Sequence, residues 1–371
     1  MTRSKWKFGR IFLAMAFSIL LIRHANSADV FEIKGVYVDV TADNVTEARK
    51  KAMAEGQERA FDLMLHRLTL KEDRGLLPWV EPRKRAQYIL DFSVADEKTS
   101  AVRYLAKLTF HFKPDLIRNL LKERAIPFAE TISKPLLVLP LFKDGTRLTL
   151  WDEPNPWSAA WSKRPANNGL VPIALPLGDL EDISGLSARQ AADADPAALL
   201  NMAQRYGVNS AVVAQLVVAG RDENGQPNDV DLVVTRVGGV NEGRSTSLGI
   251  RAQEGETSEE FLKRVTMQVS DDIEEEWKRQ NLLQFGQSNV LPVNLNITGL
   301  PEWLSVKKRL AKVAVVRRIE LALLSKDTVQ LNLHFIGNLD QLIGSLRQVD
   351  LDLTLEHESW SLVNLGEGSR S

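Results

Sequence analysis

The first part of the chain combines a strand pattern with a helix pattern. Every second residue from Val36 to Val40 is a valine, as in a strand with one buried face. A long segment after Asp43 carries apolar residues at helical spacing, and many of them are alanines, which allow a helix to lie close to a sheet. Alternating residues at 88–112 predict a hairpin. We therefore expect residues 28–130 to form a small two-layer α+β domain.

The middle of the chain, residues 134–286, is predicted to form a second domain. The run 136–139 is continuously apolar, as in a central strand buried on both faces. Thr257 and Glu260 predict a capping box, and the helix that follows repeats an apolar residue at every fourth position. Alternation of strands and helices indicates an α/β layered domain.

The third region, residues 289–365, has the clearest pattern. It reads as strand, helix, two strands, helix and strand, with the leucines at 351, 353 and 355 forming the last strand. This β-α-β-β-α-β order is typical of a ferredoxin-like domain. The predicted fold class is thus α+β, with several small two-layer α/β sandwich domains of which the last is ferredoxin-like. Residues 366–371 are predicted to be a disordered tail.

The N-terminal residues differ from the rest. Met1–Arg10 holds four basic residues and no acid, Ile11–Ile22 has no charge, and small residues follow at 25–28. This pattern predicts a signal peptide at 1–27, since the apolar run falls short of the ~20 residues of a spanning helix. We expect cleavage after residue 27 or 28 and a periplasmic protein that meets the membrane only through this segment. An uncleaved inner-membrane anchor is the alternative.

Composition narrows the chemistry. The chain has 47 basic and 48 acidic residues, and without the five basic residues of 1–27 the net charge becomes −6. Such a charge argues against nucleic-acid binding. The absence of cysteine excludes disulfides, thiolate zinc sites, iron–sulfur clusters and a lipoprotein anchor. The four histidines after residue 28 share no ligand spacing, so we expect no metal and no cofactor. They are His66, His111, His334 and His357.

A tryptophan-rich segment is the first candidate binding site. Trp151, Asp152, Trp157 and Trp161 place aromatic rings beside an acid, which could stack on a glycan or grip a peptide. The alternative is that these rings fill a seam between domains. Asp152 and Glu153 are adjacent, and adjacent carboxylates rarely face each other across a substrate. We therefore assign no catalytic residue.

A cluster of basic residues is the second candidate. It surrounds the first helix and the next strand of the third region and comprises Lys307, Lys308, Arg309, Lys312, Arg317 and Arg318. These residues could dock an acidic partner or an anionic polymer, or they could be solvated charge. The strands lack the aromatic pattern of an RNA-recognition motif, and export also argues against RNA. The acidic run at 271–276 is interpreted as a solvated helix face.

Several segments spread over the chain carry a resemblance to a known family. They are Ala48-Arg49-Lys50-Lys51-Ala52, Glu58-Arg59-Ala60-Phe61, Arg103-Tyr104-Leu105-Ala106, Phe110, Ile126-Pro127, Lys134-Pro135-Leu136-Leu137-Val138-Leu139, Leu150-Trp151 and Asn155-Pro156-Trp157. Through these segments the chain resembles the bacterial domain-of-unknown-function family 2066. The resemblance implies an exported envelope protein and brings no activity and no site residues.

These observations predict a non-enzymatic adaptor or scaffold of the cell envelope that acts by binding a protein or a ligand. An envelope protein is the expected partner, and the oligomeric state is left open. One alternative is a hydrolase of cell-wall glycan or lipid that uses carboxylates near the tryptophan segment. Another is a carrier of a small apolar ligand, which would need a closed apolar cavity.

Overall fold

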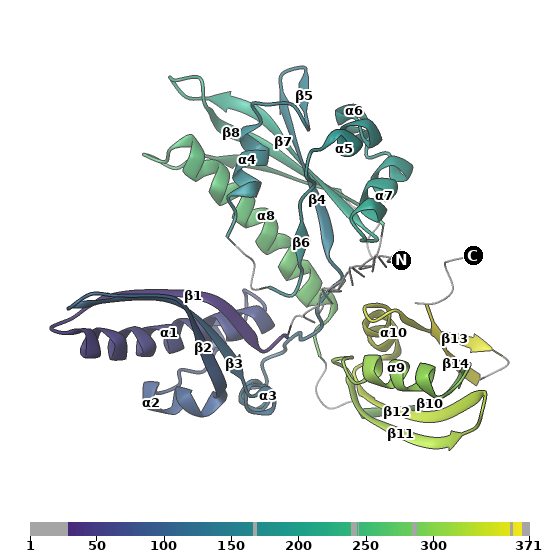
Figure 1. Cartoon of the computed structure of the whole chain (residues 1–371). Helices are drawn as coiled ribbons and strands as arrows, with labels where there is room; N and C mark the ends of the chain where they lie inside the picture. The colour runs from purple at the N-terminus through teal and green to yellow at the C-terminus, as the bar shows by residue number, and fades with distance from the viewer. Residues whose placement is uncertain are drawn as a thin grey trace, which may run out of the picture.

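Three β-sheets with packed helices make up the fold of the computed structural model (Figure 1). The structure describes residues 29–165, 169–238, 243, 245–283, 288–356 and 359–365. The predicted signal peptide, the predicted tail and His357 lie outside these ranges. Helices and strands in mixed sheets confirm the α+β class. Among the described residues, no helix has both the length and the apolar character needed to cross a membrane.

The first sheet is antiparallel, in the order β1-β3-β2, and α1 packs against one face of it. Its elements are β1 (Glu32–Thr41), α1 (Val45–Leu68), α2 (Pro82–Arg85), β2 (Ile89–Thr99), β3 (Arg103–Phe112) and α3 (Pro114–Glu123). The predicted close approach of helix and sheet is confirmed. A Cβ atom added to Gly56 of α1 would lie 2.5 Å from Leu108 Cδ1, so the helix can lie at this distance only because residue 56 has no side chain.

The second sheet has the order β5-β4-β7-β8-β9, with β6 beside β4. Helices α4 and α8 pack on one face, and α5, α6 and α7 cover the other (Figure 1). Its elements are β4 (Leu136–Asp144), β5 (Arg147–Thr149), α4 (Pro156–Ser162), β6 (Ile173–Ala174), α5 (Leu180–Gly185), α6 (Ala188–Ala192), α7 (Pro196–Arg205), β7 (Ala211–Arg221), β8 (Pro227–Val237), β9 (Ser245–Arg251) and α8 (Ser258–Gln280). As predicted, β4 is buried on both faces, and α8 begins with the capping box of Thr257 and Glu260.

The third sheet has the order β11-β12-β10-β14-β13. Its elements are β10 (Ser288–Asn296), α9 (Leu300–Leu310), β11 (Val316–Leu324), β12 (Thr328–Ile336), α10 (Leu339–Arg347), β13 (Leu351–Glu356) and β14 (Ser359–Asn364). The first six elements follow the predicted order.

The ferredoxin-like detail is not confirmed, because β14 follows the strand that was predicted to be the last. In a ferredoxin-like sheet the strand after the second helix lies beside the first strand. Here β14 takes that place, runs parallel to β10 and pairs with β13 on its other side. Trp360 and Leu362 alternate along β14 and lie opposite Leu355 and Leu353 of β13. These cross-strand apolar pairs stabilise the added strand.

The hydrophobic core also connects regions that the sequence treats separately. One continuous cluster of buried side chains runs from the first sheet through Phe128 and Leu283 into the third sheet. The main-chain N–H of Leu283 donates to the oxygen of Phe128 at 2.8 Å. The second sheet has two further clusters, one on each face.

Candidate functional site

The tryptophan segment lies in the core, so the predicted aromatic binding surface is wrong for Trp157 and Trp161. Both rings are fully buried where α4 packs on the second sheet, and they meet edge to face with centroids 5.7 Å apart. Trp157 Nε1 donates to the oxygen of Ala214 at 2.8 Å. Trp151 is half-buried, and Asp152 is exposed beside it. The rings fill a helix–sheet interface within one layered unit.

Two arginines of the predicted basic surface serve internal contacts. Arg309 donates to the side-chain oxygen of Asn364 at 2.9 Å and so attaches α9 to the end of β14. Arg317 donates to Glu130 at 2.9 Å, and Arg118 donates to the other carboxylate oxygen at 2.7 Å. The carboxylate of Glu130 is almost fully buried between them. These arginines therefore hold the fold together and are not free for a partner.

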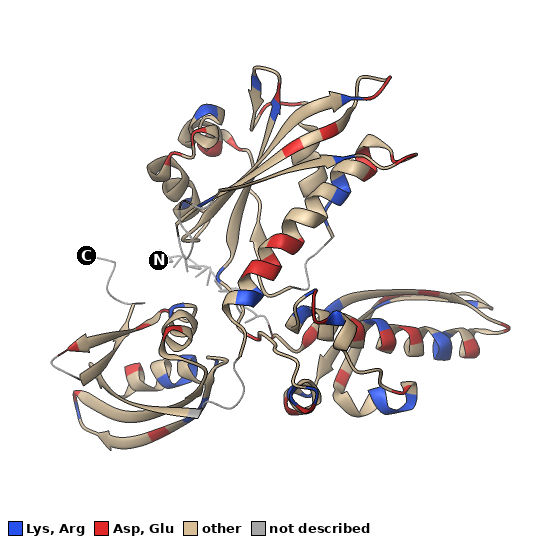
Figure 2. Cartoon of the chain, turned by 180° about the vertical axis from the view of Figure 1, so that it is seen from behind, with Lys and Arg blue, Asp and Glu red and all other residues tan. Residues whose placement is uncertain are grey.

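The remaining members of the basic cluster do not form one continuous face. Arg318 pairs with Glu320 at 2.9 Å. Lys307 and Lys308 are exposed at the C-terminal end of α9. Figure 2 shows acidic and basic residues interspersed over the helices and strands of the described part of the chain. The structure thus reduces the predicted basic surface to the lysines of α9 and Lys312 just beyond it.

Helix α8 holds several parts of the chain through its acidic run. The interpretation of 271–276 as a solvated face is wrong for Glu274, which is buried and accepts hydrogen bonds from the main-chain N–H groups of Leu170 and Val171 at 2.8 and 2.9 Å. Buried carboxylates need such partners because removing a charge from water is costly. The acidic run therefore has a structural role that its composition does not reveal.

The C-terminal half of α8 also binds the loop that follows α1. Lys278 is buried and donates to the oxygen of Thr69 at 2.7 Å and to Glu275 at 2.6 Å. Glu275 accepts a further hydrogen bond from the main-chain N–H of Lys71 at 2.9 Å. Burial alone would raise the pKa of Glu275, but the hydrogen bonds from Lys278 and Lys71 outweigh it and lower this pKa below its ordinary value of 4.5.

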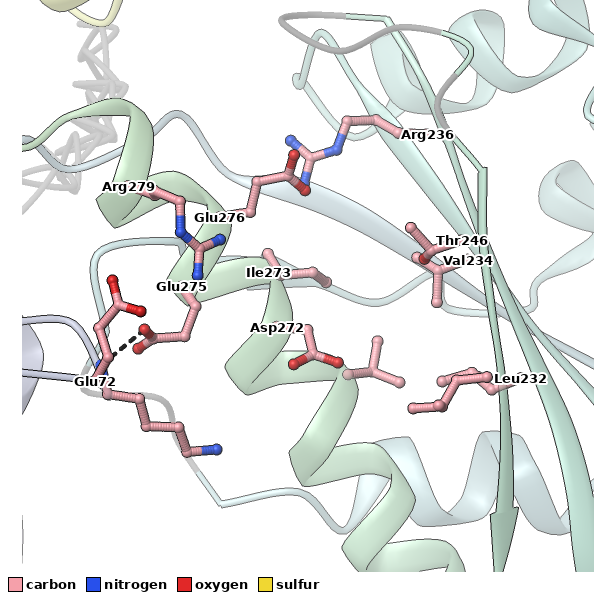
Figure 3. A pocket seen from close by; sticks show the side chains of 13 residues that line it. Glu72, Leu232, Val234, Arg236, Thr246, Asp272, Ile273, Glu275, Glu276 and Arg279 are labelled. Carbon is pink, nitrogen blue, oxygen red and sulfur yellow. Dashed lines mark hydrogen bonds between the residues drawn. The ribbon is translucent and has the colours of Figure 1, made fainter.

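These contacts create a cleft of about 510 Å³ between α8, the strands β8 and β9, and the loop at 71–72 (Figure 3). We call it the α8–β9 cleft. This volume is within the range of known ligand sites. Its lining residues are Lys71, Glu72, Leu232, Val234, Arg236, Thr246, Leu248, Val269, Asp272, Ile273, Glu275, Glu276 and Arg279.

The floor of the cleft is an apolar part of the sheet that is buried at Leu232 and open at Leu248. Leu232 of β8 lies opposite Leu248 of β9, and Val234 lies opposite Thr246, so these four side chains share one face. On that same face of β9, Ile250 is 7% exposed whereas Leu248 is 46% exposed. The cover provided by the helix therefore ends between these two residues, and the floor beyond it is open to solvent.

The wall of the cleft contributed by α8 carries a carboxylate without a partner. Asp272 lines the cleft, and it forms no hydrogen bond or ion pair with any described residue. Desolvation raises the pKa of Asp272, the charge of Lys71 opposes this shift in part, and the charges of Asp271 and Glu275 add to it. A cationic group entering the cleft would relieve this unfavourable environment.

One edge of the cleft is a strand with an open hydrogen-bonding side. β9 is the last strand of the second sheet and pairs only with β8 among the described strands. Its sequence, Ser-Thr-Ser-Leu-Gly-Ile-Arg, contains no proline or lysine, and its only charge is at its C-terminal end. In natural proteins, prolines and charged side chains, lysine above all, commonly prevent an edge strand from pairing with a further strand. The arrangement of apolar floor, unpaired acid and open strand suits recognition of an extended chain.

Sequence reasoning did not single out this cleft. Leu232, Leu248 and Asp272 are separated in the sequence and carry no motif. The only local signal was Asp272, as a member of an acidic run. Among the described residues, no group of three or more His, Asp or Glu side chains is placed to hold a metal ion.

Comparisons with known proteins add no identification. No family model matches the chain, and no curated protein matches it. One solved structure that aligns with it is a formyltetrahydrofolate deformylase from Pseudomonas putida KT2440. That alignment covers 65% of this chain and 90% of the deformylase, with 11% sequence identity and a TM-score of 0.15. A TM-score this low supports no conclusion about fold or function.

Proposed function

We propose that this protein is a non-enzymatic adaptor of the cell envelope, and that it binds an extended segment of a partner protein in the α8–β9 cleft. The observation that carries the proposal is the open edge of β9 beside an apolar floor that α8 leaves uncovered at Leu248. Export, on the pattern of residues 1–27, is part of the proposal and makes an envelope protein the partner.

Strand addition is the mechanism that fits this geometry. The partner segment would pair its main chain with the free side of β9, and every second side chain would point toward the cleft. An apolar side chain would cover Leu248, which is exposed on this face. A neighbouring lysine or arginine would lie near Asp272, where it would offset the unfavourable placement of that carboxylate.

Selection of peptides tests the proposal without a known partner. A library of random peptides would be selected on the purified protein, and the enriched peptides measured by calorimetry. We expect enriched sequences to alternate apolar and basic residues and to bind Leu248→Lys at least about tenfold more weakly, since one charge would enter the apolar floor.

The matched control is Ser247→Lys, which places the same charge on the opposite face of the same strand. This variant should bind the selected peptides within about twofold of the wild type. Failure to enrich any peptide, or equal loss in both variants, would show that the cleft is not the binding site.

A further inference from the structure

Helix α5 has the reverse of the usual polarity of a surface helix. Its acid Asp182 is fully buried, whereas Leu180 is 85% exposed and Ile183 is 48% exposed. Leu177, in the segment that leads into the helix, is 79% exposed. We call these three aliphatic residues the α5 surface. Several large apolar side chains presented together to solvent are typical of an interaction site.

A hydrogen-bond network beneath the α5 surface holds it in place. Asp182 accepts from the main-chain N–H of Gly178 at 2.8 Å and from the hydroxyl of Tyr206 at 2.6 Å, and it pairs with Arg205. The hydroxyl of Tyr206 in turn accepts from the main-chain N–H of Leu177 at 2.7 Å. The segment is therefore fixed before it meets a partner, which lowers the entropic cost of binding.

The charges around the α5 surface indicate the charge of a surface that would complement it. Asp179 and Glu181 flank Leu180, and the side chain of Glu181 is 76% exposed although it contacts Arg205. A complementary surface would combine exposed aliphatic side chains with basic ones.

Helix α9 of the same chain offers such a surface. Leu300 and Leu304 are more than half exposed and lie four residues apart on one face of the helix. Lys307 and Lys308 follow one turn later and are exposed, and neither forms an ion pair with a described residue. We call these four residues the α9 surface.

We propose that the protein self-associates through docking of the α5 surface of one copy on the α9 surface of a second copy. Within one copy, α5 packs on the second sheet and α9 on the third, and Figure 1 shows them well apart, so the two surfaces of one chain do not cover each other. Both surfaces are apolar at the centre, and their charges have opposite signs. The leucines would pack together while Glu181 lies near the two lysines.

This contact is heterologous, since each copy uses two different surfaces. A heterologous contact continues from copy to copy and produces a ring or an open chain of molecules. Self-association of this kind does not involve the α8–β9 cleft. The inference is therefore independent of the proposed function, and each can be tested without the other.

Sedimentation velocity of the full chain at rising concentration tests the association. We expect the wild type to assemble at micromolar concentrations, and Leu180→Asp and Leu304→Asp to weaken assembly at least about tenfold. Leu90→Asp, at an exposed leucine of β2, should assemble like the wild type. A wild type that stays monomeric up to about 100 μM overturns the proposal, because its association would then be weaker than a specific contact.

Mixing the two variants gives a sharper result. Leu180→Asp keeps an intact α9 surface and Leu304→Asp keeps an intact α5 surface, so together they should form a dimer of one copy each and nothing larger. Two variants that stay monomeric when mixed, or that assemble alone, contradict a contact between α5 and α9.

Exchange of two charges tests the same contact without the aspartates of Leu180→Asp and Leu304→Asp, so the test remains valid if either aspartate disturbs folding. Glu181→Lys and Lys308→Glu change two exposed residues, and each alone should weaken assembly. A single chain that carries both changes should recover most of the wild-type association. Lack of recovery would show that these two side chains do not meet.

Discussion

Lys278 of α8 donates a hydrogen bond to the main-chain oxygen of Thr69, 2.7 Å away and 209 residues earlier in the sequence. Its side chain is only 3% exposed and also pairs with Glu275. One ammonium group thus attaches the end of α1 to the helix that covers the second sheet. The position of the loop at 71–72, and with it one wall of the α8–β9 cleft, depends on this contact.

Removal of this ammonium group should destabilise the protein strongly. Lys278→Met would leave the oxygen of Thr69 and the carboxylate of Glu275 without their buried partner, and we expect a loss of about 3 kcal/mol. Urea denaturation measures this change. Lys263→Met, at an exposed position of the same helix, should change stability by less than about 0.5 kcal/mol. Similar losses in the two variants would contradict the role given to Lys278.

Acid should weaken the same region through Glu275. Because its pKa is lower in the folded protein than its ordinary value of 4.5, its ionised form stabilises the fold above that pH, and the benefit is lost as the pH falls through the lowered pKa. Glu275→Gln should cost about 1–2 kcal/mol at pH 7 and should show a smaller loss of stability below pH 4.5. Unfolding measured from pH 7 to pH 3 gives both values, and Glu254→Gln is the exposed control. Parallel pH profiles for wild type and Glu275→Gln would rule out the effect.

The two buried tryptophans should differ in sensitivity. Trp157 Nε1 donates to Ala214, whereas Trp161 Nε1 is buried without an acceptor in reach among the described residues. Both substitutions by phenylalanine remove similar volume, but only Trp157→Phe removes a hydrogen bond. We expect Trp157→Phe to be less stable than Trp161→Phe by about 1 kcal/mol. Chemical denaturation of the two variants measures this difference in stability. A Trp161→Phe variant that is less stable than Trp157→Phe would contradict the roles given to these two side chains.

Gly56→Ala tests the close packing of α1 on the first sheet. Alanine favours helix by about 1 kcal/mol over glycine. Its Cβ atom, however, would lie 2.5 Å from the buried Leu108 side chain, so we expect a net loss of about 1–3 kcal/mol. Gly75→Ala, where a Cβ atom has nothing within 4 Å, should be close to neutral. Thermal unfolding of both variants distinguishes steric strain from helix propensity.

Local signals made much of the fold predictable. The capping box of Thr257 and Glu260 and the four-residue apolar repeat behind it depend on neighbours within one helix, and both are present in α8. The sequence does not single out β14 because Val363 interrupts the alternation of Trp360 and Leu362, whereas the equally short β13 alternates three leucines with polar residues. The place of β14 in the sheet depends on β10, which lies more than 60 residues earlier in the chain.

The candidate site could not be predicted in the same way. The acids of 271–276 look alike in the sequence, but Glu274 binds the segment at 170–171, Glu275 binds Lys71, and Asp272 lines a cleft. Which acid meets which partner depends on how loops from other regions approach α8. Burial of the tryptophan rings likewise depends on which face of α4 packs on the sheet.

The position of β14 sets a condition on when the third sheet can form. This strand lies inside the sheet, between β10 and β13, although it is the last one to be synthesised. β13 has no direct partner in β10 and joins the sheet only through β14. Completion of the sheet therefore requires residues 359–364 to insert between two strands that both precede them in the sequence. Loss of residues 359–364 would remove an interior strand and detach β13 from the rest of the third sheet.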